Sequence, residues 1–307
     1  MTGAELLAGH GITPEPAPTA SPARFPDGAH FRIEIPSVEG PAVFLAAVEA
    51  AVAAGVTVNR VSQGSGAMLL AQAELAEMAR IGADHGIEVS LFVGPREEWD
   101  TGRSAQAADG PALAGRLRGA RQLRYAVDDV LRAVDQGIRG FLVGDTGLLQ
   151  VLAEAQAAGQ IPVSVVWKVS AVLAPSNPVS LRQLESLGAS TVNVPSDVTL
   201  GQLAEMRAVT SLPIDLYVEA PSGMGGVVRG QESADLVAVT APMYTKFGLR
   251  NSRLLYPSGL HLVNEAALIA REKVHRAAVA LEWIERSGLD LVQSGPAAAG
   301  LGVPELA

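Results

Sequence analysis

The sequence has no cysteine, few aromatic residues and a deficit of positive charge. None of the 307 residues is Cys, which excludes disulfides, thiolate-bound zinc, Cys-held iron–sulfur clusters and a cysteine nucleophile. The 23 basic residues are outnumbered by 32 acidic ones, for a formal net charge of −9. This charge repels nucleic acid and anionic membranes, so we expect neither as a partner.

Long apolar runs and targeting patterns are also missing. No apolar run approaches the roughly 18 residues that a membrane span requires. The opening residues MTGAELLAGHG lack a basic stretch followed by an apolar run, which is the pattern of a secretory signal. We therefore expect a cytoplasmic protein.

One pattern is present and repeats along the chain: a short β-branched run, a turn with Pro or Gly, then a segment with helical periodicity. The predicted strands are residues 31–36, 56–62, 87–93, 138–144, 163–169, 190–194, 213–219 and 235–240. Eight such units favour a single-domain (β/α)8 TIM barrel over an open doubly wound sheet. We place the barrel at 29–288, after a disordered or extended Pro/Ala-rich arm at 1–28 and before a C-terminal tail at 289–307.

Two helices can be placed by their apolar faces. In 40–55 the residues Leu45, Val48 and Val52 share one face, and in 264–288 a face runs from Val274 to Ile284. Glycines at 55, 86, 137 and 188 are predicted to end helices just before the next strand. Proline follows several predicted strands, including 235–240, and is expected to stiffen the loops that come next.

Alternation along the strands predicts a polar barrel lumen, because the apolar residues must face the helices. The polar inward set is Arg32, Glu34, Ser164, Lys168, Thr191, Asn193, Asp215, Tyr217 and Glu219. An ordinary lumen holds Val, Ile and Leu, since an unpaired charge there costs several kcal/mol. The inward charges are therefore either a functional site or a buried ion network that only shapes the barrel.

Four of these residues lie near the carboxyl ends of their strands, where barrel enzymes keep their sites. They are Glu34, Lys168, Asn193 and Glu219, and we predict that they gather at the barrel mouth. Arg32 and Asp215 lie deeper and are expected to form a structural pair.

Lys168 ends a strand within an apolar run, where burial can lower the pKa of its amine toward neutral pH. A neutral amine can attack a carbonyl carbon and form a Schiff base. The alternative is a plain charge partner for Glu34 or Glu219. Lys246, predicted to follow the eighth strand, is a candidate for the same chemistry or for binding a substrate anion.

Glu34 and Glu219 are on strands that only the eighth strand separates. Two carboxylates at that range can share a proton, divide acid and base duties, or hold a divalent metal. A metal, if present, is expected to be oxygen-ligated Mg²⁺ or Mn²⁺, because only His261 among the histidines is placed to reach the mouth. The metal ligands stay unassigned.

Several loops are candidate substrate-binding segments. Glycine-rich turns can present backbone amides to phosphate or carboxylate, and arginine binds either anion through two hydrogen bonds. The candidates are Arg60, Gln63, Arg96, Ser222, Gly225, Gly226, Lys246 and Arg250, together with Asn193. Catalytic motifs of other classes are missing: there is no Gly-x-Ser-x-Gly elbow with a plausible triad, no Walker A, no H-E-x-x-H and no G-x-G-x-x-G after a strand.

The predicted loops 94–114 and 247–263 exceed the usual connection length. Trp99 in the first, and Leu254, Leu255 and Tyr256 in the second, need a surface to cover. We predict that these loops close over the mouth or pack against a neighbouring subunit, and we expect a homo-oligomer.

The phrases Phe31–Pro36, Val61–Gly66, Leu91–Arg96, Asn193–Asp197 and Pro242–Asn251, within the span 31–286, are similar to bacterial sequences of the peptidase U32 family. The resemblance implies a TIM barrel and, through the family's label, a peptidase. The chain departs from the iron–sulfur branch of that family, because it has no cysteine.

Three functions remain open from the sequence. The first is a lyase, aldolase or isomerase acting on a small anionic carbonyl compound, with Lys168 as its reactive amine and Glu34 or Glu219 as its base. The second is a U32-like peptidase or metal-assisted amide hydrolase. The third is a barrel that binds a metabolite without catalysis.

Overall fold

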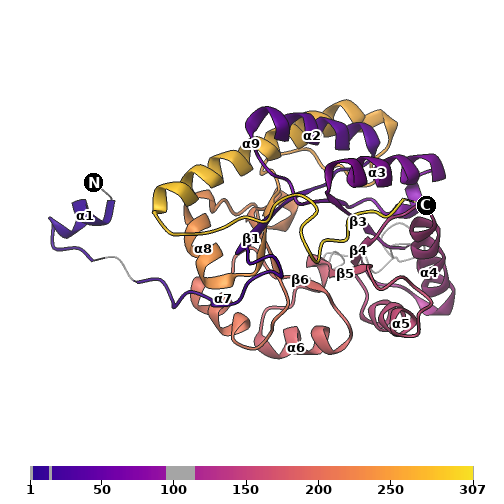
Figure 1. Ribbon diagram of the computed structural model, residues 1–307, viewed down its shortest axis with the longest axis horizontal. Helices are drawn as coiled ribbons and strands as arrows, with labels where there is room; N and C mark the ends of the chain where they lie inside the picture. Colours follow the sequence, from indigo (N-terminus) through magenta and orange to yellow (C-terminus); the bar gives the residue numbers. More distant parts are fainter. Residues whose placement is uncertain (1–2, 14–15, 95–114, 307) are drawn as a thin grey trace.

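The computed structural model describes residues 3–13, 16–94 and 115–306. Its eight parallel strands close into one barrel in the order β1-β2-β3-β4-β5-β6-β7-β8, with the helices outside (Figure 1). The strands are β1 (Phe31–Pro36), β2 (Arg60–Gln63), β3 (Glu88–Phe92), β4 (Gly140–Val143), β5 (Val166–Val169), β6 (Thr191–Asn193), β7 (Ile214–Glu219) and β8 (Met243–Phe247). The predicted (β/α)8 barrel is confirmed.

The α-helices of the described residues alternate with the strands, apart from the first, which precedes the barrel. They are α1 (Gly3–Ala8), α2 (Pro41–Ala54), α3 (Gln72–His85), α4 (Gly119–Asp135), α5 (Thr146–Ala157), α6 (Pro178–Ser186), α7 (Leu200–Arg207), α8 (Ser233–Thr240) and α9 (Val263–Ser287). Short 3₁₀ turns occur in several loops, among them η1 (Ala67–Leu69), η6 (Ser222–Met224) and η8 (Leu260–Leu262). No helix of the described chain is both long enough and apolar enough to cross a bilayer.

The eighth predicted strand is wrong. Residues 235–240 lie in helix α8, and the strand is Met243–Phe247. A short apolar run such as DLVAVT does not reveal its period, so a buried helix and a buried strand look alike in it. Pro242 therefore precedes β8, at a position where a missing N–H does not interrupt the strand ladder.

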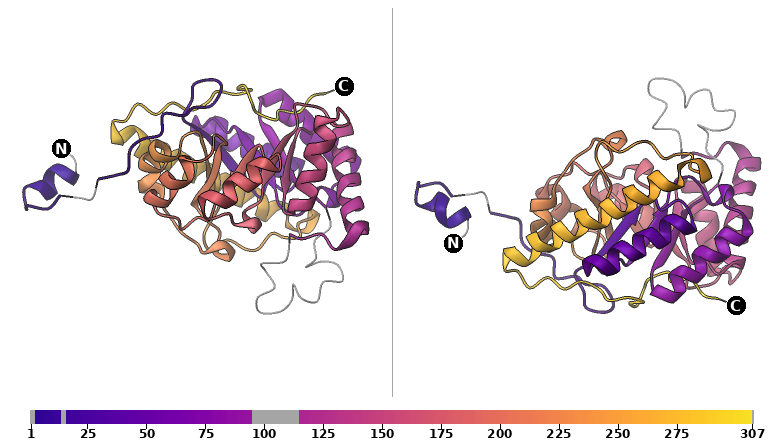
Figure 2. Two further views of the ribbon diagram at one scale, coloured as in Figure 1. Left: turned by 90° about the horizontal axis from the view of Figure 1, so that it is seen from below. Right: turned by 90° about the horizontal axis from the view of Figure 1, so that it is seen from above.

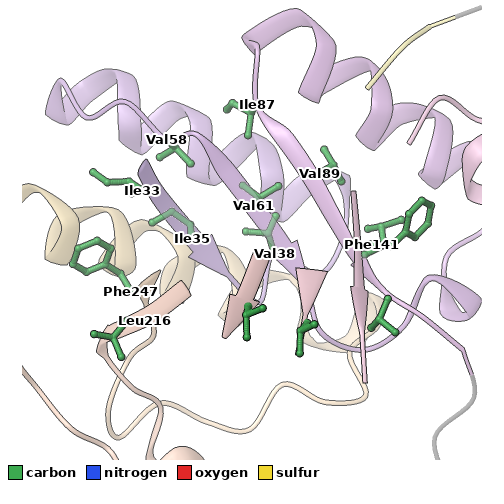
Figure 3. Close-up of a cluster of buried hydrophobic side chains, with 14 of the residues drawn as sticks. Ile33, Ile35, Val38, Val58, Val61, Ile87, Val89, Phe141, Leu216 and Phe247 are labelled. Carbon is green, nitrogen blue, oxygen red and sulfur yellow. The ribbon is translucent and has the colours of Figure 1, made fainter. Parts of the chain in front are cut away.

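The main hydrophobic core lies between the strands and the surrounding helices. Ile33, Ile35, Val61 and Val89 occupy this layer (Figure 3) and are all buried. The predicted face of α9 is confirmed at Val274, Ala277 and Ile284. The predicted face of α2 is right at Val48, which is buried, and wrong at Leu45 and Val52, which are 40% and 77% exposed. The other buried residues of the helix are Val43, Phe44, Ala46, Ala47 and Ala51.

Glycine ends helices where the sequence predicts it. Gly55 and Gly86 close α2 and α3 with φ near +65° and +62°, in the left-handed region that glycine enters without strain. Each turn leads the chain back toward the barrel for the next strand. The glycines thus fix the amino-terminal end of the barrel.

The amino-terminal end of the barrel is covered by the C-terminal tail, which crosses it (Figures 1 and 2). Ser294 N–H donates to the carbonyl of Phe31 (3.0 Å), Gly302 N–H to the Glu88 carboxylate (3.1 Å), and Glu305 N–H to the carbonyl of Gly137 (2.9 Å). A ligand approaching the lumen from this end meets packed chain. We therefore look for a functional site toward the carboxyl-terminal end of the strands.

The N-terminal arm has two parts. Helix α1 stands away from the barrel in all views (Figures 1 and 2). Residues 16–28 form no helix or strand, yet Ser21 and Phe25 are buried, with the Phe25 ring 5.4 Å from that of Tyr244. The last part of the predicted arm therefore packs against the barrel.

Candidate active site in the barrel lumen

The lumen holds two levels of charged side chains, as the alternation predicts. At the lower level the Arg60 guanidinium meets three carboxylates: Glu88 at 2.6 Å, Asp215 at 2.8 Å and Glu34 at 3.4 Å. Its flat face lies 3.5 Å from the centre of the Tyr244 ring. Arg60 was a candidate for substrate binding, but all the partners that satisfy it are protein groups, which makes it a structural centre of the lower lumen.

Arg32 does not form the predicted pair with Asp215. Its guanidinium donates to Ser294 Oγ (3.0 Å), Tyr244 Oη (3.0 Å) and the carbonyl of Ala299 (2.6 Å), so it binds the C-terminal tail. Asp215 instead accepts from Arg60 and from Thr191 Oγ1 (2.7 Å). Arg32 is on the side of the lumen that the tail closes, and the sequence gives no sign that the tail returns there.

The upper level is built around Lys168 and Glu34, which touch each other from β5 and β1. The Lys168 Nζ donates to Glu34 Oε2, and both side chains are fully buried. Burial, with the positive charge of Lys246 nearby, lowers the pKa of Lys168 to about 7, although the Glu34 carboxylate opposes the shift. A substantial fraction of this amine is therefore neutral at physiological pH.

Glu34 is held as a carboxylate. Its burial opposes ionisation, but Lys168, Lys246 and Arg60 together bring the pKa of Glu34 well below its usual range. Ser62 Oγ donates to Oε1 at 2.7 Å, and Lys246 Nζ lies 3.6 Å from the same oxygen. Sequence reasoning missed Ser62, although it follows Arg60 by two residues on β2 and therefore shares its inward face.

The sequence predicts Lys246 just after the eighth strand, but in the structure Lys246 lies within β8. Its Nζ donates to Asn193 Oδ1 and lies 4.2 Å from the centre of the Tyr217 ring. The Asn193 amide in turn donates to the carbonyl of Val169 (2.5 Å), which fixes its orientation. The structure thus brings together Glu34, Lys168, Asn193 and Lys246 from four strands.

The three lysines of the chain share one property. The sequence contains lysine only at 168, 246 and 273, and all three side chains are buried. Lys273 belongs to α9 and donates to the carbonyl of Pro36 (2.7 Å); burial lowers the pKa of Lys273 to about 8. Two of the three are therefore in the lumen, and the third is outside it.

Glu219 is not part of this cluster. The pairing of β7 with β8 shifts register between Tyr217 and Glu219, and a bulge of this kind re-aims the side chain. The Glu219 carboxylate accepts from Arg250 N–H (2.9 Å) and lies 3.5 Å from Nε of Arg276 on α9. Its partners do not overlap with those of Glu34, so the sharing of a proton between the two finds no support in their contacts.

The glycine-rich turn after β7 uses its own amides. Met224 and Gly226 N–H donate to the carbonyl of Pro221 (2.8 and 3.1 Å), and Gly225 N–H donates to that of Ser222 (3.2 Å). Ser222 Oγ accepts from Asn251 N–H (2.9 Å), which ties the turn to the loop after β8. Anion binding at Ser222, Gly225 and Gly226 stays a prediction, and in this conformation those amides are already used.

A pocket of about 100 Å³ lies at the rim of the barrel, between α2, η1 and η8. Gln63 lines it, but the Gln63 amide binds both N–H and C=O of Gly66 and so braces its own loop. Glu39 also lines it and accepts from Gly64 and Ser65 N–H (2.9 and 3.0 Å). Burial raises the pKa of Glu39. Sequence reasoning missed Glu39, which is in the turn after β1.

Of the two long loops predicted to cover the mouth, the structure describes only the one after β8. Arg96, Trp99 and the rest of 95–114 lie outside the described residues. In the loop after β8, Leu255 is buried against the barrel and Tyr256 Oη hydrogen bonds Ser37 Oγ (2.6 Å), so the rim covers part of the predicted apolar cluster. Leu254 is 76% exposed, and Arg250 is also exposed.

The described residues contain no group of three or more His, Asp or Glu side chains placed to hold a metal ion. The Glu34 carboxylate, the strongest acidic candidate, is surrounded by Lys168, Lys246 and Arg60. A carboxylate that is already surrounded by three cationic side chains is a poor ligand for a divalent metal ion. The expected Mg²⁺ or Mn²⁺ therefore has no matching donor set in this part of the chain.

The similarity of this chain to known proteins is limited to the fold. No family model and no curated protein sequence matches the chain. Among solved structures, a provisionally assigned fructose-1,6-bisphosphate aldolase from Coccidioides immitis is 12% identical, covers 84% of this chain and 91% of that chain, and has a TM-score of 0.51. A U32 peptidase is 20% identical over 65% of this chain and 73% of that chain, with a TM-score of 0.42. These proteins share the barrel architecture, and the reaction has to be argued from the lumen.

Proposed function

We propose that the protein is an enzyme that forms a Schiff base between Lys168 and a small anionic carbonyl compound, in chemistry of the lyase, aldolase or isomerase type. The observation that carries the proposal is the full burial of Lys168 against Glu34 in the lumen; burial lowers the pKa of the lysine to about 7, although the Glu34 carboxylate opposes the shift. A lysine needed only as an ion-pair partner gains nothing from a lowered pKa. A lysine that attacks a carbonyl needs it.

The first stage uses the neutral amine. The Lys168 nitrogen lone pair bonds to the carbonyl carbon, the C=O π electrons move to oxygen, and the oxygen takes up a proton. The carbinolamine then loses water as the C=N⁺ bond forms. The resulting iminium is next to the Glu34 carboxylate, whose negative charge stabilises it in a low-dielectric lumen.

The second stage breaks a bond at the neighbouring carbon. In proton transfer, Glu34 takes the proton of a C–H bond and the electron pair flows toward the iminium nitrogen, giving an enamine. In a lyase reaction a C–C bond supplies that electron pair, and the departing carbon leaves as a carbonyl compound while its hydroxyl proton passes to Glu34. Reprotonation and hydrolysis by water then release product and restore Lys168. The low pKa of Glu34 makes it a weak base, so charge stabilisation is its larger contribution.

Lys246 is proposed as the partner of the substrate's anionic group. Its Nζ is held by the Asn193 amide oxygen and faces the same carboxylate as Lys168. Arg60 is already shared with Glu88 and Asp215 at the lower level. Once the iminium has formed on Lys168, its charge and that of Lys246 face the single carboxylate of Glu34 in the upper lumen, which supports an anionic substrate.

Reduction with borohydride tests the proposal. The protein is incubated with a panel of 2-oxo acids and sugar phosphates, reduced, and mapped by peptide mass spectrometry. We expect a stable adduct on Lys168 for at least one compound. Because the chain has three lysines, Lys273→Met is a matched control: it removes a buried amine outside the lumen and should leave the adduct intact. No adduct with any compound, in a folded protein, would reject the Schiff base and favour a non-catalytic binding barrel.

We also propose a homo-oligomer, supported by the exposed Leu254 beside the barrel mouth. Sedimentation velocity of the wild type and of Leu254→Glu measures it. A smaller sedimentation coefficient for the variant is expected. A wild-type monomer at micromolar concentration would reject the assembly and leave the chemistry untouched.

A further inference from the structure

Ser90 has a buried hydroxyl that no described residue satisfies. The side chain is fully buried, and Ser90 Oγ has no hydrogen-bond partner within the described ranges. Ser90 follows Glu88 by two residues on β3, and the Glu88 carboxylate binds Arg60 in the lumen, so Ser90 also faces the lumen. The other unpartnered buried side-chain atoms of the described chain, on Arg207 and Thr240, belong to the outer helices α7 and α8.

The neighbours of Ser90 on the adjoining strands do not take up its hydroxyl. On one side it is in register with Ser62, whose hydroxyl is already given to Glu34. On the other side it is in register with Gly140, which contributes no side chain. A Cβ at Gly140 would lie 2.6 Å from the carbonyl oxygen of Val89, so no larger residue fits there. Burial of a hydroxyl without a partner is costly, and such a group needs a reason.

The Lys168–Glu34 contact divides the lumen into two halves, because β5 and β1 are opposite each other in the closed barrel. The half formed by β6, β7 and β8 carries Asn193, Tyr217 and Lys246, and it is cationic. The half formed by β2, β3 and β4 carries the Arg60–Glu88 pair at its lower level and, above that pair, the neutral hydroxyls of Ser62 and Ser90. At the upper level the Lys168 amine therefore lies between a half with a lysine and a half with hydroxyls.

We infer that Ser90 contacts the substrate, and that the substrate is a small hydroxylated oxo acid. This inference rests on the proposed Schiff-base function. The carbonyl carbon bonds to Lys168, the anionic group lies in the half with Lys246, and a hydroxyl on the other side of the carbonyl binds Ser90. A hydroxyl fits this position because it both donates and accepts and carries no charge to desolvate.

The test compares two probes and two variants. The probes are 4-hydroxy-2-oxobutanoate and 2-oxobutanoate, which differ by one hydroxyl. The readout is the probe concentration that gives half-maximal borohydride trapping at Lys168. We expect the wild type to need about tenfold less of the hydroxylated probe, the usual effect of one well-formed hydrogen bond. Ser90→Ala should remove this preference and leave trapping of 2-oxobutanoate unchanged.

Thr240→Val is the matched control, since it removes the other buried, unpartnered hydroxyl, on helix α8 outside the lumen. It should keep the tenfold preference. Ser90→Ala should unfold at the wild-type temperature or above, because the deleted hydroxyl has no protein partner among the described residues. Should this variant fail to fold, Ser90→Cys keeps the size, offers a weak donor and should also lose the preference.

The outcomes separate this inference from the function beneath it. Trapping at Lys168 with equal concentrations for both probes, or a preference that Ser90→Ala leaves intact, overturns the role of Ser90 and leaves the Schiff base standing. Absence of trapping with every 2-oxo acid overturns both.

Discussion

Two sets of buried charges share the barrel lumen, and they use different cations. The lower set is centred on arginine: Arg60 meets Glu88, Asp215 and Glu34, while Arg32 binds the C-terminal tail. The upper set is centred on lysine, with Lys168 and Lys246 around the remaining faces of Glu34. Glu34 contacts cations of both sets: Arg60 of the lower set, and Lys168 and Lys246 of the upper set.

The two cations differ in how firmly they hold their proton when buried. A guanidinium stays protonated and offers a planar fork that satisfies several carboxylates at once. Burial opposes the charge of Arg60, but Glu88, Asp215 and Glu34 outweigh it and raise the pKa of Arg60 still further. An ammonium loses its proton readily when it is buried. Arginine supplies every other basic position, since lysine occurs only at 168, 246 and 273. Within the lumen, both lysines belong to the upper set.

The largest effect expected is on stability, from the lower set. Arg60→Met leaves Glu88 and Asp215 buried without their main cation, and should destabilise the protein by about 3–5 kcal/mol. Urea unfolding followed by circular dichroism measures the change. Arg271→Met, which breaks an exposed pair with Glu49, is the control and should behave like the wild type. A mild effect at Arg60 would contradict the structural assignment of the lower set.

Lys168→Met should have the opposite profile. Methionine keeps the length of the stem and removes the charge, and Glu34 retains Arg60 at 3.4 Å and Lys246 at 3.6 Å. We expect a loss of stability below about 2 kcal/mol, together with complete loss of borohydride trapping. Unfolding as severe as that of Arg60→Met would instead make Lys168 a structural ion-pair partner.

Stability should also rise with pH because of the lysines. The folded pKa values of Lys168 and Lys273, about 7 and about 8, lie below their unfolded values, so the unfolded chain binds more protons between about pH 7 and pH 10. The free energy of unfolding should therefore increase over this window, by an amount on the order of 3–4 kcal/mol between pH 7 and pH 9 when the two lysines are added. In Lys168→Met the increase should shrink to the part from Lys273. A profile identical to that of the wild type would show that Lys168 keeps an ordinary pKa.

The smallest effect is a shift in the pH dependence of trapping. The trapping rate should rise through a midpoint near pH 7 as Lys168 loses its proton. Lys246→Met removes a positive charge that lowers the pKa of Lys168, so the midpoint should move up, by about half a unit. Glu34→Gln removes the charge that raises it and should move the midpoint down. Shifts in the reverse directions would contradict the electrostatic account of the upper set.

The barrel and its polar lumen could be predicted from the sequence because both depend on local periodicity. The alternation of apolar and polar residues in β1 and β5 was enough to predict that Glu34 and Lys168 face the lumen. The eighth strand could not be found, because the apolar run of α8 resembles a strand. The predicted pairing of Arg32 with Asp215 was wrong because Arg32 instead binds the C-terminal tail. The return of the tail to the barrel from residue 294 onward is not visible in any local sequence pattern. Glu219 was misplaced by a bulge.

A crystal structure of the borohydride-reduced complex with a 2-oxo acid tests the central claim most directly. The account predicts continuous density from Lys168 Nζ into the ligand, with the ligand carboxylate next to Lys246 and no movement of Arg60. A ligand bound only at the rim pocket near Gln63 and Glu39, or a lumen in which Lys168 remains on Glu34 at saturating ligand and reductant, would contradict it.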